Sequence, residues 1–256
     1  MISKIISIVN QKGGVGKTTT VINLAAVFVA LKKKVLIIDF DPQGNASSGL
    51  DIPTDDKERC NIYNLFASKI SINELIYKTK IPLLDIIPCT MDLASTEVEL
   101  AQAKDREYKL KNNISNVENL YDLILIDCPP SLGLLTVNAL VASTTILIPL
   151  QCEFFALEGL SNLLDTANRI KENFNPKLNI NGIFLTMYDR RNRLTEQVEQ
   201  DVRGCLGEMI YKTVIPRNIK LSESSSHGVP AILYDPSCQG SIAYMKLAEE
   251  ILKRIM

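Results

Sequence analysis

Nine residues near the amino terminus, Gln11 to Thr19, have the composition of a loop that binds phosphate groups. They read Gln-Lys-Gly-Gly-Val-Gly-Lys-Thr-Thr. Glycines let backbone N–H groups close on a phosphate chain, and the helix that follows adds partial positive charge at its amino end. Lys17 would reach the β- and γ-phosphates, and the Thr18 hydroxyl would ligate Mg²⁺. The candidate phosphate-binding residues are Gly13, Gly14, Val15, Gly16, Lys17, Thr18 and Thr19.

The elements around this loop occur in the order that phosphate binding requires. A β-branched run at 5–9 precedes it, and an apolar-periodic segment at 20–26 follows it. This is a strand, a glycine loop and a helix, which disfavours the alternative of a glycine-rich turn that binds nothing. The loop departs from the standard pattern in two places, because Gln11 stands where glycine is usual and Lys12 puts a charge inside it.

Aspartates follow two continuous apolar runs, 35–38 and 123–126, which are typical of buried parallel strands. Ligands bind at the carboxyl ends of such strands, so Asp39 and Asp41 are candidates for metal and water chemistry and Asp127 is a candidate metal ligand. In phosphate-loop ATPases, an aspartate in the position of Asp127 holds Mg²⁺, usually through a water. The alternative for the first pair is a turn or helix cap ahead of a proline.

Four motifs, at residues 12–19, 39–45, 127–131 and 216–223, resemble the ParA/Soj branch of the deviant phosphate-loop ATPases. That class also includes MinD and the nitrogenase iron protein, and the resemblance runs nearly from end to end. It implies an ATPase that uses ATP and Mg²⁺ and forms a homodimer with ATP. It also implies that Lys12 reaches the partner's phosphates, that Asp41 positions the attacking water, and that the nucleotide meets Met187, Arg217 and Asn218.

Three arginines, Arg190, Arg191 and Arg193, form the only dense arginine cluster in the chain. The formal net charge is −1, so nucleic-acid binding would need a local patch or an assembly rather than a basic surface. The family resemblance associates Arg190 and Lys220 with DNA binding that ignores sequence. It also implies a ParB-like partner protein that stimulates hydrolysis. A solvated arginine face is the alternative.

The remaining pattern predicts one α/β domain over 1–256, with a predominantly parallel twisted sheet and helices on both faces. Further strands are expected at 83–88, 145–149 and 180–187, and a polar helical region at 92–120. Loops are expected at 51–60 and in the serine-rich segment 222–228. Helices are expected at 62–66, 72–76, 132–142, 156–174, 195–206 and 240–255.

The composition, with 46% hydrophobic and 22% charged residues, is that of an ordinary globular protein. No apolar run approaches the roughly 18 residues of a membrane span, and no cleavable signal peptide is recognisable. A cytoplasmic protein is therefore expected, and the family resemblance implies that it associates with the nucleoid. Six cysteines without Cys-x-x-Cys spacing suggest neither a zinc site nor a disulfide framework, and most are expected to be buried.

Other functions receive less support from the sequence. A MinD-like, membrane-associated cell-division-site ATPase needs a free amphipathic terminal helix, and consecutive Glu249 and Glu250 argue against stable membrane association. An electron-transfer iron protein needs two cysteines at a dimer axis, for which Cys89 and Cys128 are conceivable. The lone His227 makes neither a metal site nor a triad. No helix-turn-helix segment precedes the first strand, so operator binding is not expected.

Overall fold

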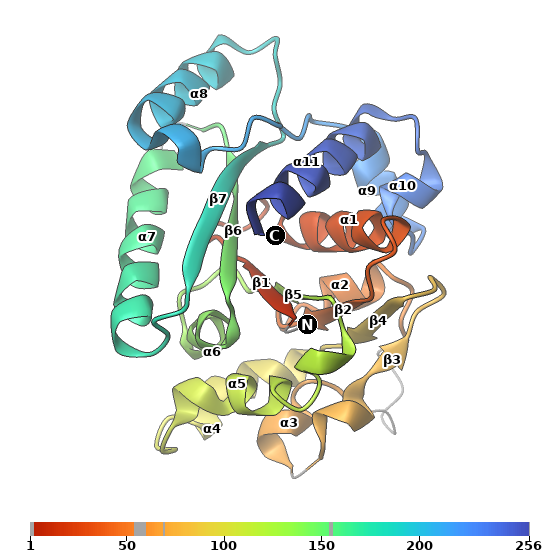
Figure 1. Ribbon diagram of the computed structural model, residues 1–256, viewed down its shortest axis with the longest axis vertical. Coiled ribbons are helices and arrows are strands. Elements are labelled where there is room, and N and C mark those ends of the chain that lie inside the picture. Colours follow the sequence, from red (N-terminus) through yellow and green to blue (C-terminus); the bar gives the residue numbers. More distant parts are fainter. Residues whose placement is uncertain (1–2, 54–59, 69, 154–155, 256) are drawn as a thin grey trace.

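A twisted sheet forms the centre of the chain in this computed structural model, which describes residues 3–53, 60–68, 70–153 and 156–255. Its strands pair in the order β3-β4-β2-β5-β1-β6-β7 (Figure 1). Every pair is parallel except β3 with β4. The predicted fold class is confirmed. The strands are β1 Lys4–Ile8, β2 Val35–Asp39, β3 Tyr77–Lys78, β4 Leu84–Ile87, β5 Leu123–Asp127, β6 Thr145–Gln151 and β7 Asn179–Thr186.

Helices cover both faces of the sheet, as Figure 1 shows. α1 and α11 lie side by side on one face with α9 and α10, while α5, α6 and α7 lie on the other. The longer helices are α1 Lys17–Ala30, α5 Lys109–Ile114, α6 Leu134–Ala142, α7 Ala156–Asn173, α8 Arg193–Leu206, α9 Ile219–Ser226 and α11 Gln239–Ile255. Shorter ones are α2 Asn45–Ser48, α3 Asn64–Ala67, α4 Thr96–Glu99 and α10 Ala231–Tyr234.

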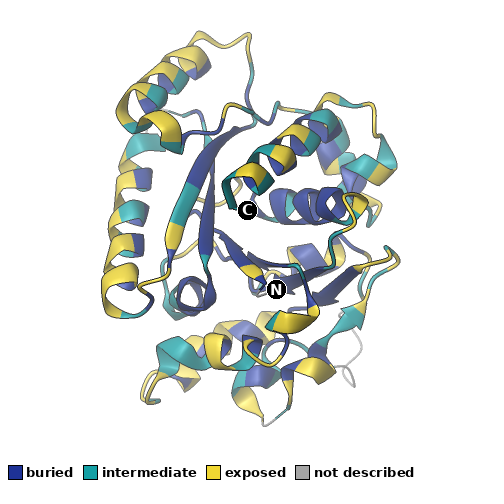
Figure 2. Ribbon diagram, in the orientation of Figure 1, coloured by how far each residue is buried: buried dark blue, intermediate teal, exposed yellow. Residues whose placement is uncertain are grey.

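Strand alternation divides the apolar residues into two cores. In β2, Leu36 and Ile38 pack towards the α6 and α7 side, whereas Val35 and Ile37 pack towards α1 and α11. Successive side chains of a strand point to opposite faces, so one continuous apolar run supplies both layers. The strands are accordingly buried along most of their length in Figure 2. This explains why the strand segments lack any polar alternation.

The serine-rich segment 222–228 was predicted to be a loop, and this prediction is wrong. Residues up to Ser226 belong to α9, which begins after Asn218, whose side chain accepts from the backbone N–H of Lys220. Serine disfavours helices because its hydroxyl competes for backbone groups. Here the hydroxyls of Ser225 and Ser226 donate instead to the carbonyls of Leu221 and Glu223 within the helix.

The helical region predicted at 92–120 is present but broken into short pieces. α4, α5 and three single 3₁₀ turns, Met91–Ser95, Arg106–Tyr108 and Glu118–Leu120, fill it. Asp105 has a φ of 54°, a left-handed conformation that no α-helix can continue through. The predicted loop at 51–60 lies in part outside the described residues, at 54–59.

Candidate functional site

The loop after β1 has the backbone geometry that its glycines allow. Gly14 and Gly16 have φ of 75° and 88°, a region where a Cβ atom introduces strain. Gly16 directly precedes α1, so the first helical N–H groups face the loop. The carbonyl of Val15 accepts from the Thr186 hydroxyl at 2.9 Å, and the Asn10 side chain accepts from the N–H of Lys12 at 2.9 Å. The loop is thus fixed to β7 and to its own entrance.

Lys17 lies inside the loop rather than on the surface. Its side-chain nitrogen donates to the carbonyl of Lys12 at 3.1 Å, and the residue is only 6% exposed. Burial lowers the pKa of Lys17, while the carboxylates of Asp127 and Asp41 act in the opposite direction. A buried ammonium that points back over the loop is suited to a phosphate bound there.

Two buried carboxylates end β2 and β5. Asp39 and Asp127 are both fully buried, and neither oxygen of Asp127 has a hydrogen-bond partner among the described residues. Burial raises the pKa of Asp127 well above its usual range, the negative charge of Asp39 adds to this, and the positive charge of Lys17 partly offsets it. Unpaired buried oxygens are costly, and hard cations such as Mg²⁺ take oxygen ligands. The residues present therefore fit a Mg²⁺ site.

Asp39 is engaged on one side only. Its Oδ2 accepts from the backbone N–H and the hydroxyl of Ser47, at 2.8 and 2.6 Å, while Oδ1 has no partner among the described residues. Burial raises the pKa of Asp39 to about 6 despite the two bonds from Ser47. Ser47 was not singled out in the sequence, because its role depends on α2 folding back over β2.

Asp41 lies in the turn after β2 and is 7% exposed. Its Oδ1 accepts from the N–H of Gln43 at 3.0 Å, and its carbonyl accepts from the N–H of Gly44 at 2.9 Å. The turn contact accounts for one carboxylate oxygen. The turn itself places the side chain within electrostatic range of Lys17.

The side chain of Lys12 extends away from the loop and forms an ion pair with Glu153, which lies between β6 and α7. Both side chains are about half exposed, at 51% and 45%. The neighbouring Gln11 donates through Nε2 to the carbonyl of Gly159 in α7, at 2.7 Å. Gln11 and Lys12, the two residues that depart from the standard loop pattern, therefore both connect the loop to the region where α7 begins. These connections could not be predicted from the sequence.

A cavity of about 180 Å³ opens beside the loop. It brings together the start of α1, the end of β7 and the start of α9, including Gly16, Thr19, Met187, Arg217 and Asn218. These residues were grouped by the family resemblance, and the fold assembles them although they are some 170 to 200 positions apart in the chain. At about 180 Å³ this cavity is smaller than the roughly 300 to 1,000 Å³ of sites that enclose a whole small molecule, so it can take only part of a nucleotide bound at the loop.

The predicted basic residues are only partly grouped. Arg191 is paired with Asp189 at 2.9 Å, and Lys220 with Glu223 at 2.8 Å, so much of their charge is neutralised locally. Arg193 begins α8. Arg190 is exposed and has no ion-pair partner among the described residues.

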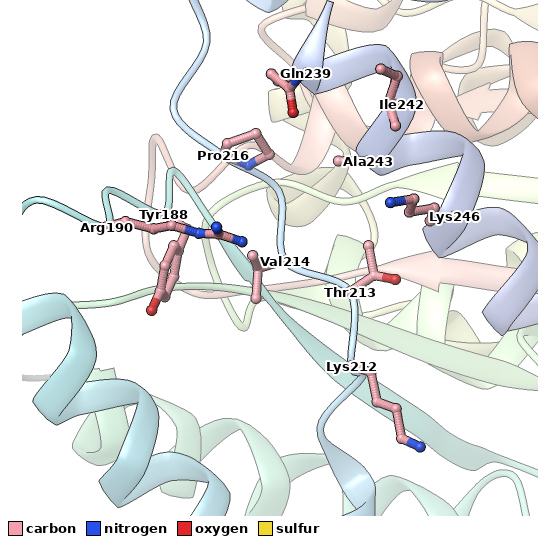
Figure 3. Close-up of a pocket in the computed structure, with 10 residues that line it drawn as sticks. All are labelled: Tyr188, Arg190, Lys212, Thr213, Val214, Pro216, Gln239, Ile242, Ala243 and Lys246. Carbon is pink, nitrogen blue, oxygen red and sulfur yellow. The ribbon is translucent and has the colours of Figure 1, made fainter.

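Arg190 lines a second cavity, of about 560 Å³, with Lys212 and Lys246. In Figure 3, Arg190 and Lys246 extend into it from opposite sides. Glu250, the nearby acid on α11, is occupied by the N–H groups of Lys212 and Thr213. The two lysines were missed in the sequence because they lie far from the arginine cluster and carry no local motif.

The cysteines follow the prediction in part. Cys89, Cys128 and Cys152 are buried, whereas Cys60 and Cys238 are half-buried and Cys205 is exposed. Burial raises the pKa of the Cys128 thiol to about 12. His227 stacks on Tyr234, with ring centroids 5.2 Å apart.

Fold and site together define a class. A phosphate loop between β1 and α1, with carboxylates at the ends of β2 and β5, is the arrangement of a P-loop nucleotide-binding protein. The family model described as an AAA domain matches residues 3–180.

Relatives align over nearly the whole chain. Sporulation initiation inhibitor protein Soj of Bacillus subtilis is 50% identical over 97% of this chain and 98% of its own length. Chromosome partitioning protein ParA of Caulobacter vibrioides is 48% identical, over 98% of this chain and 94% of its own. The chain belongs to the ParA/Soj family, and the resemblance drawn from the four motifs is confirmed.

Solved structures share the fold more widely than the family. Cobyrinic acid a,c-diamide synthase of Mycobacterium smegmatis, solved with an ATP analogue and magnesium, is 31% identical with a TM-score of 0.85, over 98% of this chain and 95% of that one. The cell-division ATPase MinD of Pyrococcus furiosus is 28% identical with a TM-score of 0.81, over 98% and 99%. The fold alone therefore does not separate these activities, and the family assignment depends on sequence identity.

Proposed function

We propose that this chain is an ATP-dependent partitioning ATPase. It binds ATP with Mg²⁺, dimerises on ATP, binds double-stranded DNA without sequence preference as a dimer, and hydrolyses ATP faster when a ParB-like partner engages it. The observation that carries the proposal is Lys12, a half-exposed cation inside a phosphate loop. A cation at the surface of the loop can reach the phosphates of a second subunit. The names of the relatives support partitioning as the process.

Each residue of the loop has a role in this proposal. The amides of Gly13 to Thr19 and the ammonium of Lys17 hold the phosphate chain, and Thr18, Asp39 and Asp127 hold Mg²⁺, directly or through water. The metal would neutralise charge on the β- and γ-phosphates. Asp41 orients the attacking water, and Lys12 of the partner adds charge to the transition state. Arg217, Asn218 and Met187 line the cavity that would take the base and sugar.

DNA binding is assigned to Arg190, Arg191, Arg193 and Lys220, with Arg190 as the principal contact because it is exposed, has no ion-pair partner among the described residues and lines a cavity with Lys212 and Lys246. The patch of one monomer consists of these four basic residues, and the chain as a whole carries a net charge of −1. A two-fold dimer doubles the patch, so affinity should depend on ATP. This predicts a cytoplasmic protein that associates with the nucleoid when it holds ATP.

A MinD-like, membrane-associated cell-division ATPase is the second candidate, favoured only by the shared fold. Its membrane attachment would need a free amphipathic helix. The apolar side of α11, including Tyr244, Leu247 and Ile251, is buried in the core that α11 shares with α1. No described helix has the length and apolarity to cross a bilayer. The burial of the apolar side of α11 favours the partitioning ATPase.

The decisive experiment measures assembly and DNA binding together. Light scattering with a non-hydrolysable ATP analogue should show a dimer, and ADP should leave a monomer. A mobility shift on an arbitrary duplex should require the same analogue. Flotation with anionic liposomes and ATP serves as the counter-test. Nucleotide-independent DNA binding, or liposome binding in place of DNA binding, would contradict the proposal.

A further inference from the structure

The cavity beside Arg190 is large enough to enclose a small molecule. It lies between the segment that follows β7, the segment 212–216 ahead of α9, and the first turns of α11, and it measures about 560 Å³. Sites that enclose a whole small molecule are typically about 300 to 1,000 Å³. The cavity beside the phosphate loop, at about 180 Å³, is the smaller of the two. The size of the larger cavity therefore fits a ligand of its own.

The lining of this cavity is positively charged. Arg190, Lys212 and Lys246 line it, and none of its described lining residues is acidic. None of these three cations has an ion-pair partner among the described residues. Arg190 and Lys246 extend into the cavity from opposite sides (Figure 3). An anion placed between them would contact both.

Two acids near these cations are occupied by other groups. Glu250, one turn beyond Lys246 in α11, accepts from the backbone N–H groups of residues 212 and 213, at 2.8 and 3.1 Å. Glu199, within electrostatic range of Arg190, accepts from the hydroxyl of Tyr188. Neither acid lines the cavity. The positive charge inside the cavity is therefore left for a ligand.

Apolar side chains form the remaining walls. Val214, Pro216, Ile242 and Ala243 line the cavity. Ile242 and Lys246 lie four residues apart in α11 and so share one face of that helix. Apolar walls stabilise an apolar part of a ligand, because burial removes its surface from water. The lining thus fits an anion attached to an apolar body better than it fits a bare inorganic anion.

Backbone hydrogen bonds fix the wall between this cavity and the nucleotide cavity. The N–H of Tyr188 donates to the carbonyl of Ile215 at 3.0 Å, and the N–H of Arg217 donates to the carbonyl of Tyr188 at 3.1 Å. Pro216, between them, lines both cavities. A preformed site loses less conformational entropy when a ligand binds. The cavity is thus built into the fold.

We propose that this cavity binds a small phosphate monoester that carries an apolar or aromatic body. A phosphate monoester has about 1.5 to 2 negative charges near pH 7. Arg190 can bind it through paired N–H groups and Lys246 as a point charge, while the body packs against Val214 and Ile242. The occupant also withdraws Arg190 from DNA. This consequence rests on the proposed function, whereas binding in the cavity does not.

Binding is tested with phenyl phosphate on protein saturated with Mg²⁺ and ADP, so that the phosphate loop is already occupied. The methyl NMR signals of Val214 and Ile242 report the cavity, and those of Val15 report the loop. The cavity signals should shift on titration. Inorganic phosphate has the charge without the ring and should bind at least about tenfold more weakly. Shifts confined to Val15 would place the probe at the loop and overturn the proposal.

A charge-matched pair of variants separates the cavity from general attraction. Lys246→Gln should weaken the binding of phenyl phosphate about tenfold, because it removes one of the two facing cations. Lys253→Gln is the control, since Lys253 is exposed on the same face of α11, two turns further on, and does not line the cavity. Equal losses in the two variants, or equal affinity for phenyl phosphate and inorganic phosphate, would show a general charge effect and refute the proposal.

The phosphates of DNA are the other source of this chemistry. A short duplex is therefore added in place of phenyl phosphate. If the duplex shifted the signals of Val214 and Ile242, depending on Lys246, and phenyl phosphate did not, the cavity would belong to the DNA surface and the proposal would be wrong.

Competition is measured by a mobility shift with a non-hydrolysable ATP analogue. Phenyl phosphate should release the duplex from the wild-type protein, and inorganic phosphate at matched ionic strength should not. Release from Lys246→Gln should need about tenfold more phenyl phosphate. A duplex retained by protein whose cavity signals are fully shifted would refute the withdrawal of Arg190. Protein that never bound the duplex would instead contradict the proposed function, and the NMR titration would still decide the cavity.

Discussion

Asp39 and Asp127 are register partners in the parallel pairing of β2 with β5. Two fully buried carboxylates therefore lie side by side at the carboxyl ends of neighbouring strands, the end of the sheet at which the phosphate loop also lies. Burial is the main cause of the raised pKa of both carboxyls, and the negative charge of Asp39 raises the pKa of Asp127 further. The arrangement favours protons or a metal ion and disfavours two bare charges.

The first prediction concerns pH and stability without nucleotide or metal. The pKa of Asp39 rises from 3.8 to about 6 on folding. The folded state thus binds a proton more tightly, and stability from this group is present below about pH 4 and lost as pH rises to about pH 6. The shift corresponds to about 3 kcal/mol. Urea unfolding across this range should show the loss, and Asp39→Asn should reduce the slope.

A surface carboxylate provides the control for this measurement. Asp165 is exposed on α7, so Asp165→Asn should leave the pH slope of the wild type unchanged. Added Mg²⁺ and nucleotide should recover stability above about pH 6, since binding to the folded state alone stabilises it. An identical slope in Asp39→Asn would mean that this carboxyl titrates normally.

The second prediction is that Lys17→Ala loses nucleotide binding. The buried ammonium of Lys17 is directed over the loop, and the loop amides do not replace its charge. We expect affinity for ATP to fall by about 100-fold or more, measured by calorimetry. Lys104→Ala, at an exposed position, should bind normally. Normal binding by Lys17→Ala would refute the phosphate-loop assignment.

The third prediction separates binding from hydrolysis at Asp41. Asp41→Asn keeps an acceptor for the N–H of Gln43 and so preserves the turn, but it lacks the charge. It should bind ATP and dimerise, hydrolyse ATP roughly 100-fold more slowly, and accumulate on DNA. Single-turnover hydrolysis and a DNA mobility shift measure the two effects. If Asp41→Asn hydrolysed ATP at the wild-type rate, Asp41 would have only a structural role in the turn.

The fourth prediction concerns DNA. Arg190→Glu should abolish DNA binding by the ATP-bound protein while leaving ATP binding and dimerisation intact. Lys220→Glu should cost less, because Lys220 already shares its charge with Glu223. Mobility shifts at two salt concentrations should show steep salt dependence in the wild type and a shallower slope in the variants, by about one per lost contact.

Lys177→Glu is the charge-matched control for this experiment. Lys177 is exposed and lies next to the amino end of β7, whereas Arg190 follows its carboxyl end. It should leave DNA binding almost unchanged. Equal losses from Lys177 and Arg190 would indicate a general charge effect rather than a patch.

The sequence predicted those parts of the molecule that depend on local signals. Apolar runs located β2 and β5, and glycines located the phosphate loop, because each signal lies within a few neighbouring residues. The loop prediction at 222–228 failed since the helical serines satisfy their hydroxyls inside α9, a choice favoured by the cap at Asn218. The low helix propensity of serine was given too much weight in this prediction, because one capping side chain, that of Asn218, also stabilises the helix.

Contacts between distant segments were not predictable. The bond from Gln11 to Gly159 and the ion pair between Lys12 and Glu153 depend on how the segment around the start of α7 returns to the phosphate loop. The site residues at 187 and 217–218 were named only through the family resemblance. Their meeting with Gly16 in one cavity follows from the strand order, which places β7 two strands from β1.

Asn218 belongs at once to the nucleotide cavity and to the cap of α9, the helix that carries Lys220. Asn218 would thus contact a ligand in the cavity and also hold the start of the helix whose Lys220 would contact a DNA duplex. Equilibrium coupling is reciprocal, so the factor by which ATP tightens DNA binding is also the factor by which DNA tightens ATP binding. Under the proposed function, the chromosome would act as a co-ligand that retains nucleotide, and molecules on DNA should exchange ATP more slowly than molecules in free solution.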